Sequence, residues 1–296
     1  MSDWRERIGL YLTEALRASL FALGPEIAKG ATDLRLRVGQ PPLLCGQADV
    51  RLASVPLSAV EVRMMVDAML GHAAHARQEE LRQGFVTLEG GFRAGLCGRA
   101  VVKEGRLFSL QDIAFVSIRI ARDVPGAAAG LMPWIWQEDG PVSALIVSPP
   151  GLGKTTMLRD AAVSLSRRGL PVVVVDERSE LAACVNGVPA LDVGPNTDVL
   201  DGCPKAEGMR LALRGMSPKV IVTDEIGSEA DTDAVLDAAR CGVAVLTSAH
   251  GRSFTEMEGR PVLTKLLKAR AFERIAVLDG RGRIGVVHGA GGEILA

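Results

Sequence analysis

The sequence Ser148-Pro149-Pro150-Gly151-Leu152-Gly153-Lys154-Thr155-Thr156 decides the fold of the second half of the chain. It follows the apolar run from Ala144 to Val147 and precedes helical spacing from Met157 to Arg167. This context is that of the phosphate-binding motif G-x-x-x-x-G-K-[ST], from which only the first glycine departs, as Ser148. The stretch predicts a strand, a nucleotide-binding loop and a helix in direct succession.

The residue types in this loop suit the binding of a nucleotide's phosphates. Gly151 and Gly153 let backbone N–H groups approach the anion, and the dipole of the following helix favours negative charge. Lys154 is expected at the β and γ phosphates, the hydroxyl of Thr155 at Mg²⁺, and Thr156 at the α phosphate. We therefore expect ATP and Mg²⁺ as cofactors. The nucleotide-binding residues are predicted to be Ser148, Pro149, Pro150, Gly151, Leu152, Gly153, Lys154, Thr155 and Thr156.

A second apolar strand, from Val220 to Thr223, ends in two acids, Asp224 and Glu225. A carboxylate at this place in a phosphate-loop domain holds the metal and its water shell. We assign Asp224, with Thr155, to the metal. Glu225 is then a candidate general base that polarises the attacking water.

Two more strands end in polar residues. The run from Val172 to Val175 is followed by Asp176 and Glu177, and the run from Val243 to Thr247 leads to His250. Ligands of open α/β sheets bind at the carboxyl ends of the strands. Glu177 is therefore a second candidate base, which the sequence does not separate from Glu225, and His250 is a candidate sensor of the γ phosphate.

The pattern of apolar strands alternating with helical segments is typical of a parallel sheet covered on both faces. It predicts an α/β fold with a RecA-like ATPase core at residues 126–296. Residues 1–125 are predicted to form a smaller α+β N-terminal domain. The stretch from Asp123 to Pro141, rich in Pro, Gly and Ala, is the predicted linker.

The N-terminal half mixes helical and alternating patterns. Helices are predicted from Trp4 to Leu23, from Ser58 to about Leu70, where Ser58 and Glu61 have capping-box spacing, and from Ala73 to Gln83. Strands are predicted at Leu34–Val38, Phe85–Leu88, Phe92–Val102 and Ile113–Ile120, and the last three are expected to form a small antiparallel sheet.

Composition narrows the class of protein. The 296 residues carry a net charge of -1 and only one Tyr, three Trp and seven Phe, which favours neither electrostatic attraction to nucleic acid nor base stacking. The five cysteines are scattered, as is typical of free thiols in a reducing compartment. No apolar run approaches the length of a membrane span. We expect a cytoplasmic protein without a span of its own that does not bind nucleic acid.

The order of phosphate loop, acidic box, Asp-Glu strand end and histidine box resembles the secretion ATPases of type II and type IV systems and the pilus-retraction motors. That family is hexameric, so the resemblance implies a homo-oligomer, and a hexamer in particular. It also implies that an N-terminal sheet supplies arginines to the nucleotide. Arg93, Arg99 and Arg119 are the matching candidates, and which of them completes the site stays open.

The sequences Val175-Asp-Glu-Arg-Ser-Glu-Leu181, Asp198-Val-Leu-Asp-Gly-Cys-Pro-Lys205 and Thr223-Asp-Glu-Ile-Gly227 are similar to those of the sporulation members of these ATPases. This resemblance implies a motor that energises a channel complex between mother cell and forespore. Its partners would be membrane-embedded channel proteins, which would hold it peripherally at the membrane.

Two other functions share the same site. One is a nucleotide-dependent nucleic-acid motor, because RecA-like cores often serve that role. The other is a nucleotide-gated assembly scaffold, in which slow turnover acts only as a clock. The sequence does not separate a scaffold from a motor, since both need the same residues.

Overall fold

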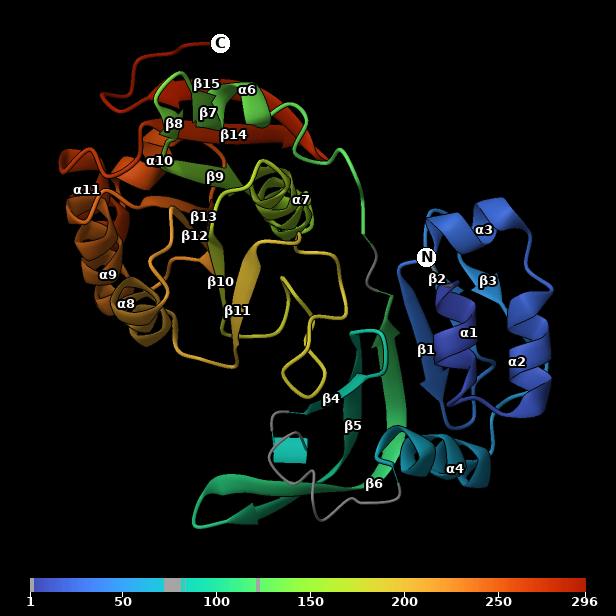
Figure 1. The fold of residues 1–296 in the computed structure, drawn as a ribbon. Coiled ribbons are helices and arrows are strands. Elements are labelled where there is room, and N and C mark those ends of the chain that lie inside the picture. Colours follow the sequence, from blue (N-terminus) through green and yellow to red (C-terminus); the bar gives the residue numbers. More distant parts are fainter. Residues whose placement is uncertain (1–2, 72–80, 83, 121–122) are drawn as a thin grey trace. The chain divides into compact units, whose positions relative to one another are not determined.

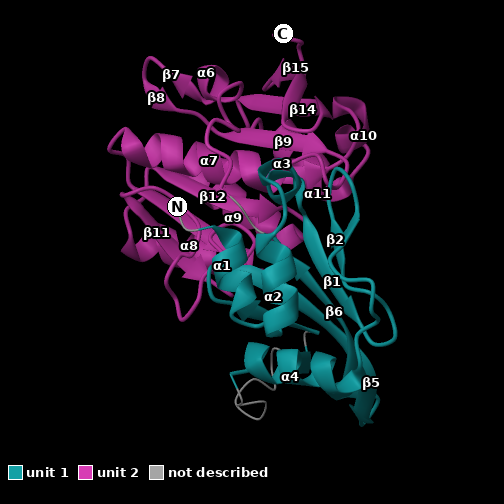
Figure 2. Ribbon diagram, turned by 90° about the vertical axis from the view of Figure 1, so that its right-hand side faces the viewer, with its two compact units in different colours: residues 1–122 teal, residues 123–296 magenta. Residues whose placement is uncertain are grey.

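The computed structural model describes residues 3–71, 81–82, 84–120 and 123–296. The chain divides into two compact units, Met1–Arg122 and Asp123–Ala296, coloured separately in Figure 2. Each unit is built around its own sheet.

Unit 2 contains a sheet with the strand order β11-β10-β12-β13-β9-β14-β15 (Figure 1). Neighbouring strands are parallel from β11 to β14, and β15 runs antiparallel to β14. The strands are β9 (Ala144–Ser148), β10 (Val172–Asp176), β11 (Thr197–Asp201), β12 (Val220–Glu225), β13 (Ala244–His250), β14 (Arg274–Gly280) and β15 (Arg283–Gly289). The predicted strands at Ala144, Val172, Val220 and Val243 are thus present in one sheet.

Helices cover this sheet on both faces. Successive strand residues point to opposite faces, so Leu145 and Val147 pack in one core and Ala144 and Ile146 in the other. The first core also contains residues of α8 (Lys205–Gly215), α9 (Glu229–Arg240), α10 (Phe254–Glu258) and α11 (Pro261–Lys268). The second contains residues of α6 (Met132–Ile135) and α7 (Lys154–Arg167). Burial on both faces explains why the strands read as continuous apolar runs.

The prediction of a linker from Asp123 to Pro141 is wrong. Ala128, Leu131 and Ile135 are fully buried in the core of unit 2, and the short strands β7 (Trp136–Gln137) and β8 (Gly140–Pro141) pair with each other. The carboxylate of Asp160 on α7 accepts hydrogen bonds from the backbone N–H groups of residues 126 and 128. The segment lacks a period because it is a series of turns, but its apolar side chains are core residues.

Unit 1 contains an antiparallel sheet with the order β3-β2-β1-β6-β5-β4. One face packs against helices, with Leu34 and Leu36 of β1 fully buried. The strands are β1 (Asp33–Arg37), β2 (Leu43–Cys45), β3 (Val50–Arg51), β4 (Phe85–Leu88), β5 (Phe92–Lys103) and β6 (Arg106–Arg119). The helices are α1 (Trp4–Gly9), α2 (Glu14–Phe21), α3 (Pro25–Gly30) and α4 (Ala59–Met69).

Two helix predictions in unit 1 need comment. The single helix expected from Trp4 to Leu23 is wrong, because α1 ends at Gly9 and α2 begins after Thr13, whose backbone is extended at the N-cap. The break lets α1 and α2 pack side by side, with Ile8 and Leu20 both fully buried. The helix expected from Ala73 to Gln83 falls largely on residues 72–80 and 83, outside the described residues.

The capping box predicted at Ser58 is confirmed. The N–H of Glu61 donates to the hydroxyl of Ser58 at 3.2 Å, and the N–H of Ser58 donates to the carboxylate of Glu61 at 2.8 Å. We predict that Ser58→Ala lowers the free energy of unfolding by about 1 kcal/mol, since the first turn of α4 loses its cap. Urea denaturation measures this, with Ser19→Ala as control, which removes a half-buried hydroxyl that donates only within its own helix to Ala15. Equal stability of the two variants would contradict the assignment.

Candidate nucleotide site

The carboxyl ends of four neighbouring strands in unit 2 bring the predicted site residues together. In the order β10-β12-β13-β9, β13 lies between the strand that leads to the phosphate loop and the strand that carries the acids. His250 is opposite Ser148 in the register of β13 and β9, and Glu225 is opposite Ser248 in that of β12 and β13. His250 therefore lies between the loop and the acidic strand end.

The loop itself adopts a conformation that depends on its glycines. Gly151 has φ 80° and Gly153, the N-cap of α7, has φ 96°, values that side-chain-bearing residues rarely adopt. The helix begins at Lys154, earlier than the Met157 expected from the sequence, so its first free N–H groups belong to the loop. The N–H of Gly282, in the turn between β14 and β15, donates to the carbonyl of Leu152 at 2.8 Å.

Lys154 is buried and directed back into the loop. Its Nζ donates to the carbonyl oxygens of Ser148 at 2.9 Å and Pro149 at 3.2 Å, and it lies 2.9 Å from Nδ1 of His250. Burial lowers the pKa of Lys154, against the opposing effect of the nearby Glu225 carboxylate. The loop thus holds its own cation through neutral acceptors.

His250 connects Lys154 to Glu225. Its Nε2 lies 2.7 Å from Oε2 of Glu225, while Nδ1 faces the ammonium of Lys154. Because an ammonium only donates, Nδ1 must be the acceptor, so the proton is on Nε2 and is donated to Glu225. The three side chains form one continuous hydrogen-bonded chain.

Asp224 has the properties of a metal ligand. It is buried at the end of β12, and within the described structure its Oδ1 makes no hydrogen bond, although Nζ of Lys205 lies 3.4 Å away. Burial raises the pKa of Asp224 to about 6, while Lys205 opposes the shift. An acidic oxygen without a hydrogen-bond donor fits a divalent cation.

Among the described residues, no group of three or more His, Cys, Asp and Glu side chains is arranged to hold a metal ion. Mg²⁺ usually takes one or two protein ligands and completes its shell with water and substrate phosphates. Asp224 and Thr155, which is half-buried in the first turn of α7, are the protein groups suited to it.

The acidic box after β10 divides into two roles. The carboxylate of Asp176 accepts hydrogen bonds from the backbone N–H groups of Glu180, Leu181 and Ala182 and so orders the following turn. Glu177 instead pairs with the ammonium of Lys205, the first residue of α8. Sequence reasoning did not assign Lys205 to the site, because a single lysine at a helix start has no pattern of its own.

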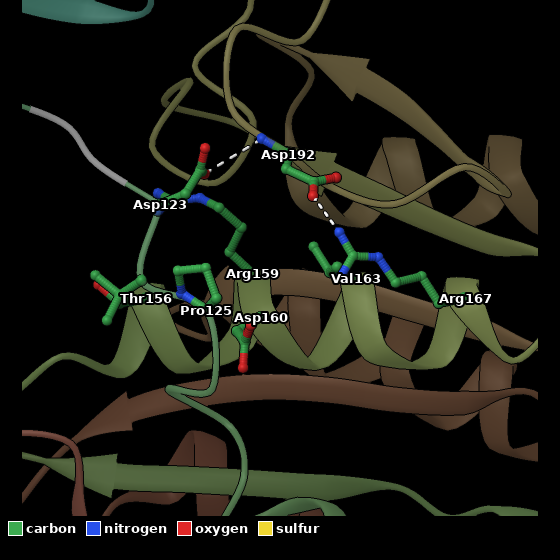
Figure 3. Close-up of a pocket in the computed structure, with 9 residues that line it drawn as sticks. Asp123, Pro125, Thr156, Arg159, Asp160, Val163, Arg167 and Asp192 are labelled. Carbon is green, nitrogen blue, oxygen red and sulfur yellow. Dashed lines mark hydrogen bonds and ion pairs between the residues drawn. The ribbon is translucent and has the colours of Figure 1, made fainter. Parts of the chain in front are cut away.

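Thr156 lies apart from this chain of polar groups. It lines a small cavity against α7 together with Asp123, Pro125 and Arg159 (Figure 3). The backbone N–H of Asp192 donates to the carboxylate of Asp123 across it at 3.2 Å. This cavity belongs to unit 2 alone.

The three predicted arginines belong to unit 1. Arg93 of β5 stacks on the ring of Phe85 at 3.5 Å, and Arg99 pairs with Asp112 at 2.9 Å. Arg119 of β6 is exposed and opposite Arg93 in the strand register. The phosphate loop belongs to the other unit, so their contribution to the site stays a prediction.

The chain matches the family model described as "Sporulation stage III, protein AA" over residues 2–293. It is 38% identical over 294 residues to the stage III sporulation protein AA of Bacillus subtilis (strain 168), covering 96% of this chain and 95% of that protein. The chain belongs to the sporulation stage III protein AA family. The predicted resemblance to the sporulation members of the secretion ATPases is thereby confirmed.

Two solved structures of other proteins are similar in fold to this family member. The Legionella pneumophila ATPase DotB is similar with a TM-score of 0.56 and 16% identity, over 83% of this chain and 72% of that one. The pilus retraction motor PilT with bound ADP is similar with a TM-score of 0.57 and 16% identity, over 84% of this chain and 74% of that one. At this identity the likeness shows the fold, and the predicted α/β, RecA-like class is confirmed.

None of the helices in the described part of this family member is long and apolar enough to cross a membrane.

Because the carboxyl of Asp224 is buried, its replacement by an amide should stabilise the protein, and the size of this effect should depend on pH. The folded pKa of this carboxyl lies above the ordinary value, so above pH 6 the folded state carries an unfavourable buried charge that Asp224→Asn removes. We expect Asp224→Asn to raise the free energy of unfolding on the order of 2 kcal/mol at pH 8. The gain should shrink as the pH falls from 6 and vanish below about 4.

Urea unfolding without metal or nucleotide, at pH 8 and pH 4, tests this expectation. Asp139→Asn, on an exposed turn, is the matched control and should change stability at neither pH. If Asp224→Asn changed the free energy of unfolding equally at pH 8 and pH 4, burial would not be raising the pKa of the Asp224 carboxyl.

Proposed function

We propose that this chain binds ATP with Mg²⁺ and hydrolyses it. The observation that carries the proposal is the chain of hydrogen bonds from Lys154 through His250 to Glu225, which joins the phosphate loop to the acidic strand end. A phosphate group in the loop offers Lys154 charged acceptors in place of neutral carbonyl oxygens and His250. Release of Lys154 from His250 would then register at Glu225.

The proposed roles follow from this geometry. The N–H groups of the loop and Lys154 bind the phosphates, and Thr155 and Asp224 bind the metal, whose charge would stabilise the transferring phosphoryl group. Glu225 is proposed as the general base, in preference to Glu177, because Glu177 is engaged by an ammonium and Glu225 by a neutral imidazole. His250 reports the presence of the γ phosphate.

The cellular role is proposed from the family. Membership in the sporulation stage III protein AA family, with the fold of DotB and PilT, supports a motor of the secretion-ATPase type with its ATPase domain at residues 126–296. We propose that it assembles as a hexamer and energises a channel between mother cell and forespore, held at the membrane by channel proteins. One of Arg93, Arg99 and Arg119 would complete the site.

Loss of the Lys154 side chain should abolish most of the ATPase activity. Lys154→Ala removes the cation that contacts the β and γ phosphates, so magnesium-dependent phosphate release should fall by roughly 100-fold or more. Release is measured across protein concentrations, with molecular mass in solution determined alongside. The exposed Lys219→Ala, also in unit 2, should keep full activity. Wild type that binds ATP but stays monomeric and idle would favour the scaffold over the motor.

Glutamine variants of Glu225 and Glu177 separate the two candidate bases. Glu225→Gln keeps a hydrogen-bond acceptor for His250 but loses the basic carboxylate, so ATP should stay bound while turnover falls by roughly 100-fold or more. Glu177→Gln should retain most of the turnover. Bound nucleotide is measured after gel filtration and turnover by phosphate release. The opposite ranking of the two variants would assign the base to Glu177.

A further inference from the structure

Lys205 is a buried cation between two of the site's carboxylates. Its side chain is 10% exposed, and its Nζ pairs with Oε2 of Glu177 and lies 3.4 Å from Oδ1 of Asp224. Glu177 directly follows β10 and Asp224 is the penultimate residue of β12, and these two strands are parallel neighbours. A single ammonium thus spans the end of the acidic box and the proposed metal ligand.

The position of Lys205 is fixed by the packing of α8. Lys205 opens this helix after Pro204, and Gly208 lies one turn later on the same face. A Cβ at Gly208 would lie 2.5 Å from Cγ1 of Val175 in β10. The missing side chain therefore lets the first turn of α8 approach the sheet closely, and this approach delivers Lys205 to the strand ends.

The charges in this region call for such a cation. Two carboxylates at adjacent strand ends repel each other, and the burial of Asp224 makes that repulsion stronger than it would be in water. Lys205 lies beside both, and among the described residues Oδ1 of Asp224 still makes no hydrogen bond of good geometry. That oxygen therefore lies near a positive charge and can still coordinate a metal ion.

We propose that Lys205 acts as a tethered counter-ion that competes with a divalent cation for Asp224 in the nucleotide-free protein. This inference rests on the proposed function, in which Asp224 binds the metal. With Lys205 in place, the site has little affinity for a free metal ion. The metal enters as a complex with the nucleotide, whose phosphates supply the additional negative charge.

Titration of the nucleotide-free protein with Mn²⁺, followed by the electron paramagnetic resonance signal of free Mn²⁺, tests the proposal. Lys205→Met removes the competing charge, so the site should bind Mn²⁺ roughly tenfold or more tightly than wild type. A merely structural lysine predicts the opposite, because its loss loosens the site. Unchanged or weaker Mn²⁺ binding by the folded variant overturns the proposal.

Matched variants keep the result interpretable. Lys265→Met breaks an exposed ion pair of the same type, with Asp233 at 2.6 Å, and should leave Mn²⁺ binding as in wild type. Lys205→Arg retains the charge and should bind Mn²⁺ as weakly as wild type. Lys205→Gln keeps a donor for Glu177, replaces the methionine variant if that does not fold, and should tighten binding equally.

The double variant Lys205→Met with Asp224→Asn identifies the ligand. It should lose the gained Mn²⁺ affinity, and affinity that persists overturns the assignment to Asp224. Because these titrations contain no nucleotide, they succeed or fail independently of ATP hydrolysis. If wild type releases no phosphate from ATP while Lys205→Met binds Mn²⁺ more tightly than wild type, the proposed ATPase activity is rejected and the counter-ion role of Lys205 is retained.

Discussion

The site is organised by the need to accommodate a buried ammonium when no phosphate is present. Lys154 is buried in the first turn of α7, where the carbonyl oxygens of Ser148 and Pro149 and the imidazole of His250 are its partners. All of these acceptors are neutral. A cation bound only by neutral groups in a partly desolvated loop is poised for an anion, because a phosphate oxygen is a stronger acceptor than any of them.

The rest of the sheet serves this arrangement. His250 reaches the loop because β13 lies between β9 and β12, and the parallel register places all their carboxyl ends at one edge. The acidic residues lie there for the same reason, and the carboxylate of Asp176 accepts hydrogen bonds from three backbone N–H groups. The buried ammonium of the loop and the carboxylates beside it are thus both stabilised by groups from neighbouring strand ends.

The sequence predicted the parts of the structure whose residue types have local consequences. Periodicity and turn chemistry were enough to predict the apolar strands and the strand ends at Asp224 and His250. They also predicted the glycines of the loop and the capping box of Ser58 and Glu61. Lys205 was missed because its role depends on the distance between α8 and β10, which Gly208 sets. The segment from Asp123 to Pro141 was misjudged because turns can bury side chains without any period, as Leu131 does.

The contact between Gly282 and Leu152 has a mechanical consequence. The N–H of Gly282 holds the loop's carbonyl from the tip of a hairpin whose register shifts twice, between Val277 and Leu278 and between Leu278 and Gly280. Such irregularities bend a strand and increase its twist. A rearrangement of the loop around a ligand would therefore either break this bond or displace the tip of the hairpin, whose second strand, β15, is the edge of the sheet.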